Sequence, residues 1–255
     1  MRTRVPRRLK KKSSRNKWPE TNENVVVKFG HLEKELSILR KLTKASSVIR
    51  LVRTWTDDNQ VQFLVLESCN YDALQDVQAH GCYSVFKCRS MIADISNALL
   101  AVAMIGYCHR DVTLENIGVM TMDAQKSFKF KLLDFDLAEA TQDRASPRYN
   151  TCGKKGYLAP EILDPFMQRL DGFTMLPYDA SIADVFALGV CAFAALTNLL
   201  PSSPAMVIRP WIDDVSRAIP ESSLKKLVIN MLWPEYTQRY SLLMVQKAVS
   251  ELNEK

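Results

Sequence analysis

Glycine is scarce in this chain, and none of it stands near the amino terminus. The 255 residues include eight glycines, and the first of them is Gly30. Glycine lets backbone N–H groups approach a bound phosphate closely, because it has no side chain and adopts unusual dihedral angles. The sequence before Gly30 therefore excludes a glycine-rich phosphate-binding loop.

Closely spaced cysteine pairs and long apolar runs are also missing. None of the six cysteines belongs to a CxxC pair, which argues against a zinc site and indicates reduced thiols inside the cell. No uninterrupted apolar run reaches the length of a membrane-spanning helix, so we predict no membrane span. No apolar core follows the basic start of the chain, so we do not expect a secretion signal.

Acidic residues are absent from positions 1–17, which carry nine Lys or Arg residues. The rest of the chain holds 25 basic and 28 acidic residues, so the net charge of +6 comes from this start. We expect residues 1–23 to form a solvated, disordered arm. The run RRLKKK also fits a nuclear-import signal or an anchor, so residues 1–17 are candidates to meet an import receptor or an anionic surface. No groove-reading helix, zinc finger or aromatic RNA platform is indicated, so nucleic acid is not expected as a partner.

Hydrophobic patterns predict short strands first and long helices later. β-branched and alternating runs indicate strands, and apolar residues every three or four positions indicate helices. An Asp-Asp-Asn turn at 57–59 joins two of the strands. The predicted strands cover 23–30, 48–55, 61–68 and 128–137, and the predicted helices cover 31–42, 90–107, 184–200 and parts of 222–251.

The change in pattern near residues 68–72 divides the chain into a small strand-rich part and a larger helical part. This order predicts an α+β fold of two lobes with a cleft between them. We assign residues 24–251 to one domain, with a reduced N-lobe at 24–69 and a mainly helical C-lobe at 70–251.

Several short motifs follow one another in a fixed order. They are VVVK ending at Lys28, a glutamate on the next helix, HRDVTLEN at 109–116, DFD at 134–136, APE at 159–161 and DVFALG at 184–189. Together they resemble the protein kinase family over residues 24–251. The resemblance implies a bilobal kinase fold, ATP and Mg²⁺ as cofactors, and a protein substrate or protein partner.

The resemblance also implies roles for individual side chains. Asp111 matches the carboxylate that orients the substrate hydroxyl and accepts its proton. Asn116 and Asp134 match the oxygen ligands of magnesium, and Lys28 matches the lysine that holds the nucleotide phosphates. Glu35 is the candidate partner of Lys28 by helix phase, and Glu33 is its rival.

Other matched residues would form the nucleotide pocket. The resemblance implies a hinge at Glu67 to Cys69, where backbone groups meet the adenine, and Leu66 as the residue guarding the space behind it. Val27 and Val65 are expected as apolar walls.

Three further residues are expected to hold the large lobe together. The resemblance implies a buried ion pair between Glu161 and Arg239, and it makes Asp184 the cap of backbone amides in the HRD loop.

Two departures from the family pattern affect the phosphates and the metal. The family pattern includes a glycine-rich loop on two strands before the lysine, which this sequence does not show. Three explanations are open: the loop and strands are lost, the basic arm replaces them, or the sequence is truncated. Lysines or arginines of the arm are a further candidate substitute as point charges. Asp136 replaces the glycine of DFG, and aspartate is among the residues that best tolerate unusual dihedral angles.

A third departure concerns the transferred phosphoryl group. Thr113 stands where the resemblance implies a lysine, and Lys154 stands where it implies a threonine. One interpretation is an exchange that returns an ammonium to Asp111, and the other is drift with Lys154 facing solvent. Arg110 hints at control by a phosphorylated activation segment, in which Ser146, Tyr149 and Thr151 are acceptors.

Two functions are open at this point. The first is a protein serine/threonine kinase that transfers the ATP γ-phosphate to protein hydroxyls. The second is a catalytically impaired pseudokinase that acts as a binding or scaffold module. Either protein is expected inside the cell, in the cytoplasm or the nucleus.

Overall fold

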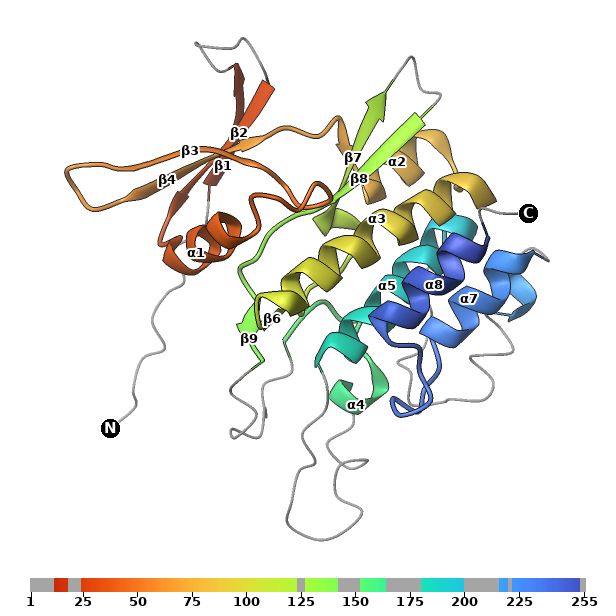
Figure 1. The fold of residues 1–255 in the computed structure, drawn as a ribbon. Coiled ribbons are helices and arrows are strands. Elements are labelled where there is room, and N and C mark those ends of the chain that lie inside the picture. Colours follow the sequence, from red (N-terminus) through yellow and green to blue (C-terminus); the bar gives the residue numbers. More distant parts are fainter. Residues whose placement is uncertain are drawn as a thin grey trace, which may run out of the picture. The chain divides into compact units, whose positions relative to one another are not determined.

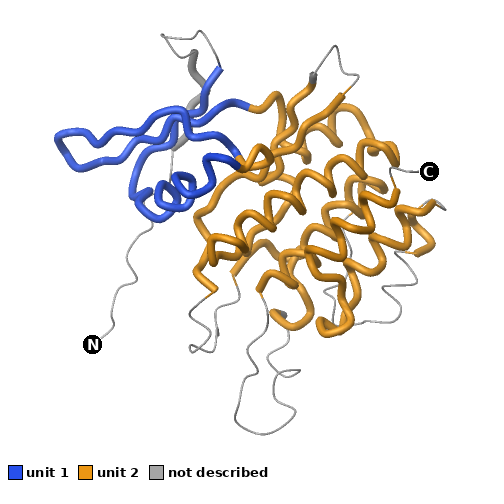
Figure 2. Tube along the Cα trace, viewed as in Figure 1, with its two compact units in different colours: residues 1–44, 49–68 blue, residues 45–48, 69–255 orange. Residues whose placement is uncertain are grey.

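The computed structural model describes residues 12–17, 24–122, 127–141, 152–163, 180–199, 216–219 and 222–252. The chain divides into two units, which Figure 2 shows in different colours. The small unit comprises residues 1–44 and 49–68, and the large unit comprises residues 45–48 and 69–255. The small one carries a sheet and one helix and the large one is mainly helical, so the predicted α+β division is confirmed (Figure 1).

The small unit is a four-stranded antiparallel sheet in the order β1-β2-β4-β3, together with helix α1. The bounds are β1 Lys12–Lys17, β2 Asn24–Gly30, α1 Glu33–Lys41, β3 Leu51–Thr56 and β4 Gln62–Glu67. β-branched residues favour β2, and the Asp57 side chain accepts the amides of Asn59 and Val61 to close the turn between β3 and β4.

Strand β1 corrects the prediction for the arm at residues 1–23. Residues Lys12–Lys17 do not lie in a disordered arm, because they pair antiparallel with β2 from Lys12 opposite Phe29 to Lys17 opposite Asn24. The pairing satisfies the backbone groups along one side of β2, which would otherwise be an open sheet edge. Polar residues fill this strand, as is common at edges. Residues 1–11 and 18–23 lie outside the described part.

Helix α1 begins abruptly after Gly30. This glycine has a φ of +136°, a conformation that side chains disfavour, and it turns the chain from β2 into the helix within two residues. Acidic residues lie in the first turn of α1 and basic residues in the last, which matches the helix dipole. Its buried face contains Leu36, Ile38 and Leu39, as the helical spacing predicted.

The large unit is built on two long helices. Helices α3 (Val85–Met104) and α5 (Ala180–Thr197) pack together, with α7 (Ser223–Met231) and α8 (Leu242–Glu251) against them (Figure 1). Helix α5 is long and apolar enough to cross a membrane by length and composition, but 83% of it is buried inside the structure. That burial is typical of a core helix. The described part also includes the short helices α2 (Ala73–His80) and α4 (Pro160–Leu163) and one helical turn at residues 216–218.

Short strands in the large unit position the loops that carry the motifs. Strands β5, β7 and β8 form one antiparallel sheet, and β6 pairs with β9. Their bounds are β5 Tyr71–Asp72, β6 Tyr107–Cys108, β7 Ile117–Met122, β8 Ser127–Leu132 and β9 Glu139–Ala140, and the 3₁₀ turn η1 covers Leu114–Asn116. The HRD loop therefore lies between β6 and β7, and the DFD segment lies between β8 and β9.

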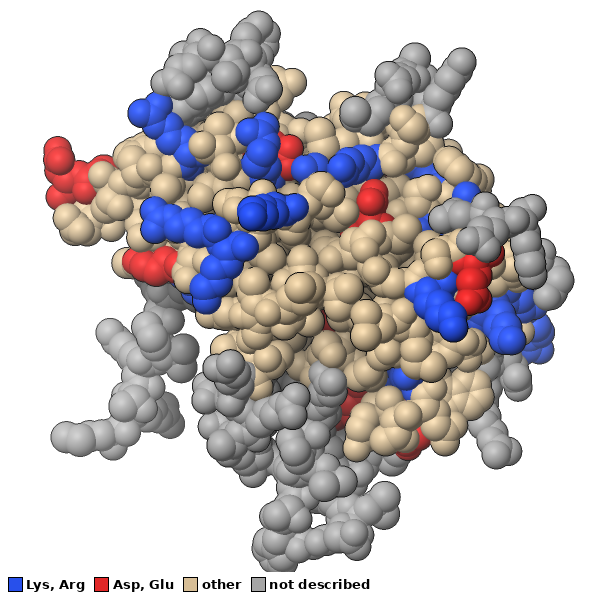
Figure 3. All heavy atoms as spheres, in the orientation of Figure 1, with Lys and Arg blue, Asp and Glu red and all other residues tan. Residues whose placement is uncertain are grey.

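The surface carries charges of both signs on the face that Figure 3 shows. On the face shown in Figure 3, Lys and Arg side chains lie among Asp and Glu side chains, and uncharged residues form most of the surface.

Candidate functional site

Lys28 of β2 forms an ion pair with Glu35 of α1. The Lys28 Nζ lies 2.8 Å from the Glu35 Oε1, and the Glu35 side chain is 1% exposed. Glu33 is exposed and takes no part in this pair. The structure therefore decides between the two glutamates, and it confirms the predicted pairing of Lys28 with Glu35. The catalytic role of the pair stays a prediction.

The sheet register shows which side chains share a face with Lys28. Lys28 lies opposite Leu64 on β4, and Val26 lies opposite Leu66. Directly opposite residues of an antiparallel pair point to the same side, and so do residues two apart in one strand. Val26, Leu64 and Leu66 therefore lie on the Lys28 face, which agrees with the place expected for Leu66.

The same register corrects two predicted pocket residues, Val27 and Val65, which were both expected as apolar walls. Val27 precedes Lys28 directly and lies opposite Val65, so both valines belong to the other face of the sheet. Val27 was chosen for its apolar side chain, but strand alternation turns it away from Lys28. Val26, two positions before Lys28, takes the place expected for an apolar wall, and its spacing from the lysine was the signal that could have identified it.

The predicted hinge follows strand β4. The Glu67 carboxylate accepts the Arg50 backbone amide at 2.7 Å, which holds the end of β4 against the start of β3. In the large unit, the Cys69 thiol packs where Gly118 has no side chain, since a Cβ at Gly118 would lie 2.4 Å from the Cys69 Sγ. The adenine-binding role of this segment stays a prediction.

Asn116 fixes the predicted catalytic base. The Asn116 Nδ2 donates to the backbone oxygen of Asp111 at 2.8 Å and to its Oδ2 atom at 2.8 Å. Both residues belong to the loop between β6 and β7. Within the turn η1, the Asn116 backbone amide donates to the Thr113 carbonyl at 3.0 Å. The loop is therefore organised by its own hydrogen bonds.

Asp134 lies beside this loop in the folded large unit. The Leu133 amide donates to the Asn116 backbone oxygen at 2.9 Å, so the residue before Asp134 is tied directly to Asn116. Asp134 itself has a φ of +55°, and the Asp136 amide donates to its Oδ1 at 3.4 Å. Non-glycine residues at positive φ are uncommon and concentrate at functional sites.

The electrostatics of Asp111 reflect these neighbours. Burial raises the pKa of the Asp111 carboxyl, and the negative charges of Asp134 and Glu115 add to the rise. The hydrogen bond from Asn116 and the positive charge of Lys154 act in the opposite direction, but burial outweighs them. The structure thus brings the predicted base, one predicted metal ligand and Lys154 within electrostatic reach of one another.

Thr113 and Lys154 line the same pocket of the large unit as Asp111. The Lys154 Nζ forms an ion pair with Glu115, and it lies 5.7 Å from the centre of the Tyr157 ring. Burial by itself would raise the pKa of the Glu115 carboxyl, but the hydrogen bond and the positive charge of Lys154, together with hydrogen bonds from the Glu115 amide and from Thr113, lower it. The two exchanged positions therefore lie together, and Lys154 has a carboxylate partner. Sequence reasoning missed Glu115, although it stands directly before Asn116.

Asp184 caps the HRD loop, as predicted. Its two carboxylate oxygens accept the backbone amides of His109 at 2.7 Å and Arg110 at 2.8 Å. The buried His109 ring lies 2.9 Å from the Leu133 carbonyl oxygen and meets the Phe135 ring edge-on. Through these contacts of His109, the HRD loop packs directly against the DFD segment.

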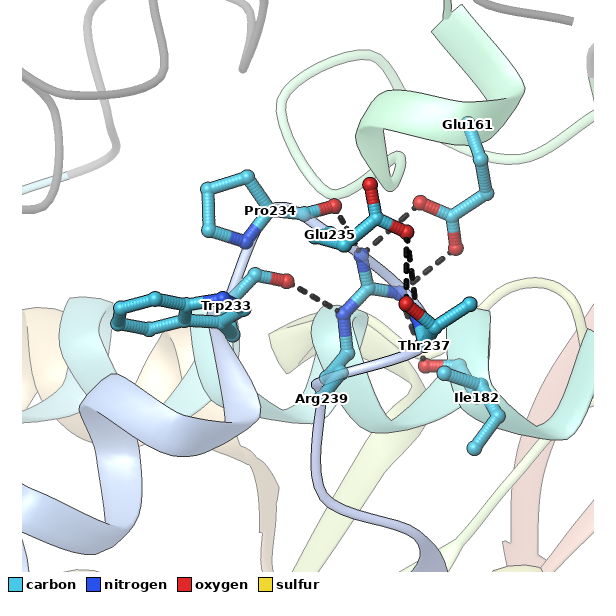
Figure 4. A network of polar contacts seen from close by, with 7 residues as sticks. All are labelled: Glu161, Ile182, Trp233, Pro234, Glu235, Thr237 and Arg239. Carbon is cyan, nitrogen blue, oxygen red and sulfur yellow. Dashed lines mark hydrogen bonds and ion pairs between the residues drawn. The ribbon is translucent and has the colours of Figure 1, made fainter.

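The predicted ion pair between Glu161 and Arg239 is confirmed. The two guanidinium nitrogens lie 2.6 Å and 2.9 Å from the two carboxylate oxygens of Glu161 (Figure 4). Three backbone carbonyls of Ile182, Trp233 and Pro234 accept the other donors. The pair therefore ties α4 to the start of α5 and to the loop after α7.

Arg110 forms an ion pair with Glu139 of β9. The three predicted phosphate acceptors, Ser146, Tyr149 and Thr151, lie outside the described residues.

Comparisons with known proteins agree with this geometry. The model of the "Protein kinase domain" family matches residues 8–250. In Schizosaccharomyces pombe, the mitosis inducer protein kinase cdr1 is 28% identical over 69% of this chain and 27% of its own length, and the serine/threonine-protein kinase cds1 is 30% identical over 66% and 34%. Calcium/calmodulin-dependent protein kinase type 1 of Caenorhabditis briggsae is 30% identical over 67% of this chain and 43% of its own. The chain thus spans less than half the length of each of these relatives.

Solved structures show the same fold. A crystal structure of the Rad53 kinase domain and SCD2 in complex with AMPPNP matches with a TM-score of 0.65 and 19% identity, over 93% of this chain and 84% of that one. The same domain pair in another crystal structure gives a TM-score of 0.67 at 18% identity. The fold is therefore the bilobal α+β fold of kinases, and the chain belongs to the protein kinase domain family.

Proposed function

We propose that this chain is an ATP- and magnesium-dependent protein kinase that phosphorylates serine or threonine hydroxyls. One observation carries the proposal: Asn116 holds both the backbone and the carboxylate of Asp111 through two hydrogen bonds of 2.8 Å. A general base must be held in place before its substrate arrives, because positioning supplies much of the rate of phosphoryl transfer.

Asp111 would orient the substrate hydroxyl and accept its proton. Its carboxylate is partly buried and fixed by Asn116, and the raised pKa brings it nearer to the range in which a base works well. Lys28 would hold the ATP phosphates as a point charge, with Glu35 fixing the ammonium at 2.8 Å.

Asn116 and Asp134 fit a magnesium ion by their chemistry. They offer one amide oxygen and one carboxylate, and oxygen ligands of this kind suit a hard cation. Asn116 turns its amide nitrogen toward Asp111, which leaves the amide oxygen on the opposite side of the planar group. When bound, magnesium would supply positive charge that neutralises the ATP phosphates.

Lys154 would replace the lysine that is missing at position 113. Thr113 and Lys154 line the pocket that contains Asp111, and the Lys154 charge already favours the ionised form of Asp111. We test the exchange with Thr113→Lys, Lys154→Thr and the double variant in a phosphotransfer assay. Coupling between the two changes supports the exchange, with the double variant more active than either single one. Additive effects would favour drift at both positions.

The alternative function is a pseudokinase that acts as a binding or scaffold module. It is favoured by the lack of glycine in residues 1–27, since the backbone N–H groups of this segment have no small residues at which to approach phosphates. Asp136 adds a negative charge to the DFD segment, which also weakens the case for nucleotide binding.

Two measurements separate these functions. Thermal unfolding with ATP, with magnesium and with both shows whether the nucleotide binds, because a ligand of the folded state raises the midpoint. Transfer of labelled phosphate to the chain itself and to a general protein substrate then shows turnover. Asp111→Asn keeps the size of the side chain and serves as the inactive control. Binding with turnover that Asp111→Asn abolishes supports the kinase, and binding without turnover supports the pseudokinase.

The remaining partners follow from the same proposal. The protein substrate would meet the chain beside Asp111, inside the cell, in the cytoplasm or the nucleus. Residues 1–17 are the candidate contact for an import receptor or an anionic surface, and deleting residues 1–11 while following the location of a fluorescent fusion tests this role.

A further inference from the structure

Arg110, the residue directly before the proposed base Asp111, forms an ion pair with Glu139. The guanidinium of Arg110 contacts the Glu139 carboxylate, and the two side chains are 12% and 40% exposed. Both residues belong to the large unit. Arg110 lies two residues after strand β6, and Glu139 begins strand β9. The pair is half shielded from water, so its attraction is screened less than that of a surface pair.

The backbone of Arg110 is held in an unusual conformation. Its φ is +67°, and its amide donates to Asp184 at 2.8 Å. A residue at positive φ keeps that conformation only where its surroundings fix it. Asp184 fixes the backbone from one side, and the ion pair with Glu139 fixes the side chain. The next residue is Asp111, so the direction of its side chain depends on how firmly Arg110 is held.

Strand β9 brings the carboxylate to this place. Cys108 pairs with Glu139 in the β6–β9 ladder, and the Cys108 Sγ donates to the Glu139 carbonyl at 3.3 Å. The Thr141 amide donates to the Gly106 carbonyl at 2.8 Å and closes the other end of the ladder. Glu139 is therefore held by its backbone on both sides, and its side chain reaches Arg110 without help from a distant loop.

We propose that Glu139 is a positioning residue, which holds Arg110 and thereby Asp111 in the place where a phosphorylated side chain would otherwise be needed. A carboxylate already neutralises the guanidinium. A phosphate carries about −1.5 to −2 charges, so it would repel Glu139 and would have to displace it to reach Arg110. This inference rests on the proposed kinase function for its effect on rate, but the ion pair can be tested without any activity.

The first experiment uses thermal unfolding of five proteins: the natural chain, Glu139→Gln, Arg110→Gln, the double variant, and the control Glu251→Gln at an exposed position of α8. Glu139→Gln should lower the midpoint by about 2–4 °C, and the double variant should lose less than the sum of the single changes. Replacing chloride by inorganic phosphate at equal ionic strength should then stabilise Glu139→Gln more than the natural chain, because Arg110 is released. That gain should vanish in the double variant. Additive losses, or phosphate stabilising the natural chain equally through Arg110, would overturn the proposal.

The second experiment measures phosphotransfer before and after phosphatase treatment. The natural chain should keep its rate within about twofold, and Glu139→Gln should lose on the order of tenfold in kcat because Asp111 is less well placed. Glu139→Asp should recover part of the loss, since it restores the charge. A natural chain that loses its rate after dephosphorylation contradicts the inference. A natural chain without any transfer removes the proposed function, and the thermal cycle with inorganic phosphate still decides whether Glu139 holds Arg110.

Discussion

Replacing Arg239 by methionine should destabilise the large unit more than any change at an exposed position. The Arg239 side chain is 0% exposed and that of Glu161 is 8% exposed, so removing the guanidinium leaves a carboxylate buried without its partner. Breaking a buried pair from one side costs about 3–5 kcal/mol. A domain holds only about 5–15 kcal/mol in total, so the expected loss is a large part of its stability.

The structure explains why this arginine should cost so much. Its five hydrogen bonds reach Glu161 on α4, the Ile182 carbonyl on α5 and two carbonyls before α8 (Figure 4). The guanidinium also lies 4.9 Å from the centre of the Phe186 ring. Methionine fills part of the volume but donates no hydrogen bond. Several buried acceptors are then left unsatisfied, and each adds its own desolvation cost.

The assay is equilibrium unfolding in urea, followed by circular dichroism, with thermal unfolding in parallel. We expect Arg239→Met to lower the thermal midpoint by about 6–20 °C. The midpoint of Arg239→Lys should lie between those of Arg239→Met and the natural chain, because an ammonium keeps the charge but cannot make the bidentate contact with Glu161. Lys226→Met, at an exposed position of α7, is the matched control.

Two outcomes separate this reasoning from a simple loss of packing. Changing both Glu161 and Arg239 to methionine should recover about 3–5 kcal/mol relative to Arg239→Met alone, because no buried charge remains. A cost of Arg239→Met within about 0.5 kcal/mol of the Lys226→Met control would refute the reasoning.

Three other predictions follow from the site. Lys28→Met should abolish the thermal shift with ATP and magnesium, whereas Glu35→Gln should keep part of it and lower kcat/KM roughly 10²-fold, because the ammonium is no longer fixed; equal effects of the two changes would count against a positioning role. Lys154→Met should move the acid limb of kcat/KM to higher pH, since removing a positive charge raises the already elevated pKa of Asp111, and Lys154→Arg should leave it in place. Asp184→Asn should lower the free energy of unfolding by about 1.5–3 kcal/mol in urea titrations, because a charged acceptor of two backbone amides is lost; no change would mean that other groups hold the loop.

The sequence was sufficient for elements whose side chains carry a strong periodic pattern. Helices α3 and α5 lie where apolar spacing predicted them, and the Ile92, Ile95 and Leu99 side chains are buried as expected. Burial imposes such patterns because one face of a helix must exclude water. The Glu161–Arg239 pair and the Asp184 cap were likewise predicted, since short motifs fixed the identity of each partner.

Strand β1 shows where the sequence was insufficient. The segment Lys12–Lys17 reads KSSRNK and has no apolar alternation, so composition favoured disorder. Its pairing depends on the open edge of β2, which is a property of the tertiary structure. Val27 was misassigned for a related reason: a run of three valines does not reveal which of them shares a face with Lys28, and only the register with β4 settles this.

The pairs that involve Lys154 and Arg110 were out of reach for a third reason. Glu115 and Glu139 lie 39 and 29 positions from their partners, and no local pattern links charged residues at such distances. Side chains on loops are brought together by the path of the backbone, which the strand pairs β6–β9 and β7–β8 determine. A sequence motif can name such residues, but it cannot state which of several charges each will meet.

The raised pKa of the Asp111 carboxyl supports the proposed kinase function over the scaffold alternative. Its carboxyl pKa is raised, so the ionised form costs stability near neutral pH; the stabilising contribution of this group is present at low pH and is lost as the pH rises through the folded-state pKa. Asp134 adds to that cost and is itself held at positive φ. Asp184 and the Glu161–Arg239 pair already hold the HRD loop and the large unit without these costs. A module that served only as a scaffold would gain nothing from two unfavourably placed carboxylates, whereas a bound cation would offset their negative charge.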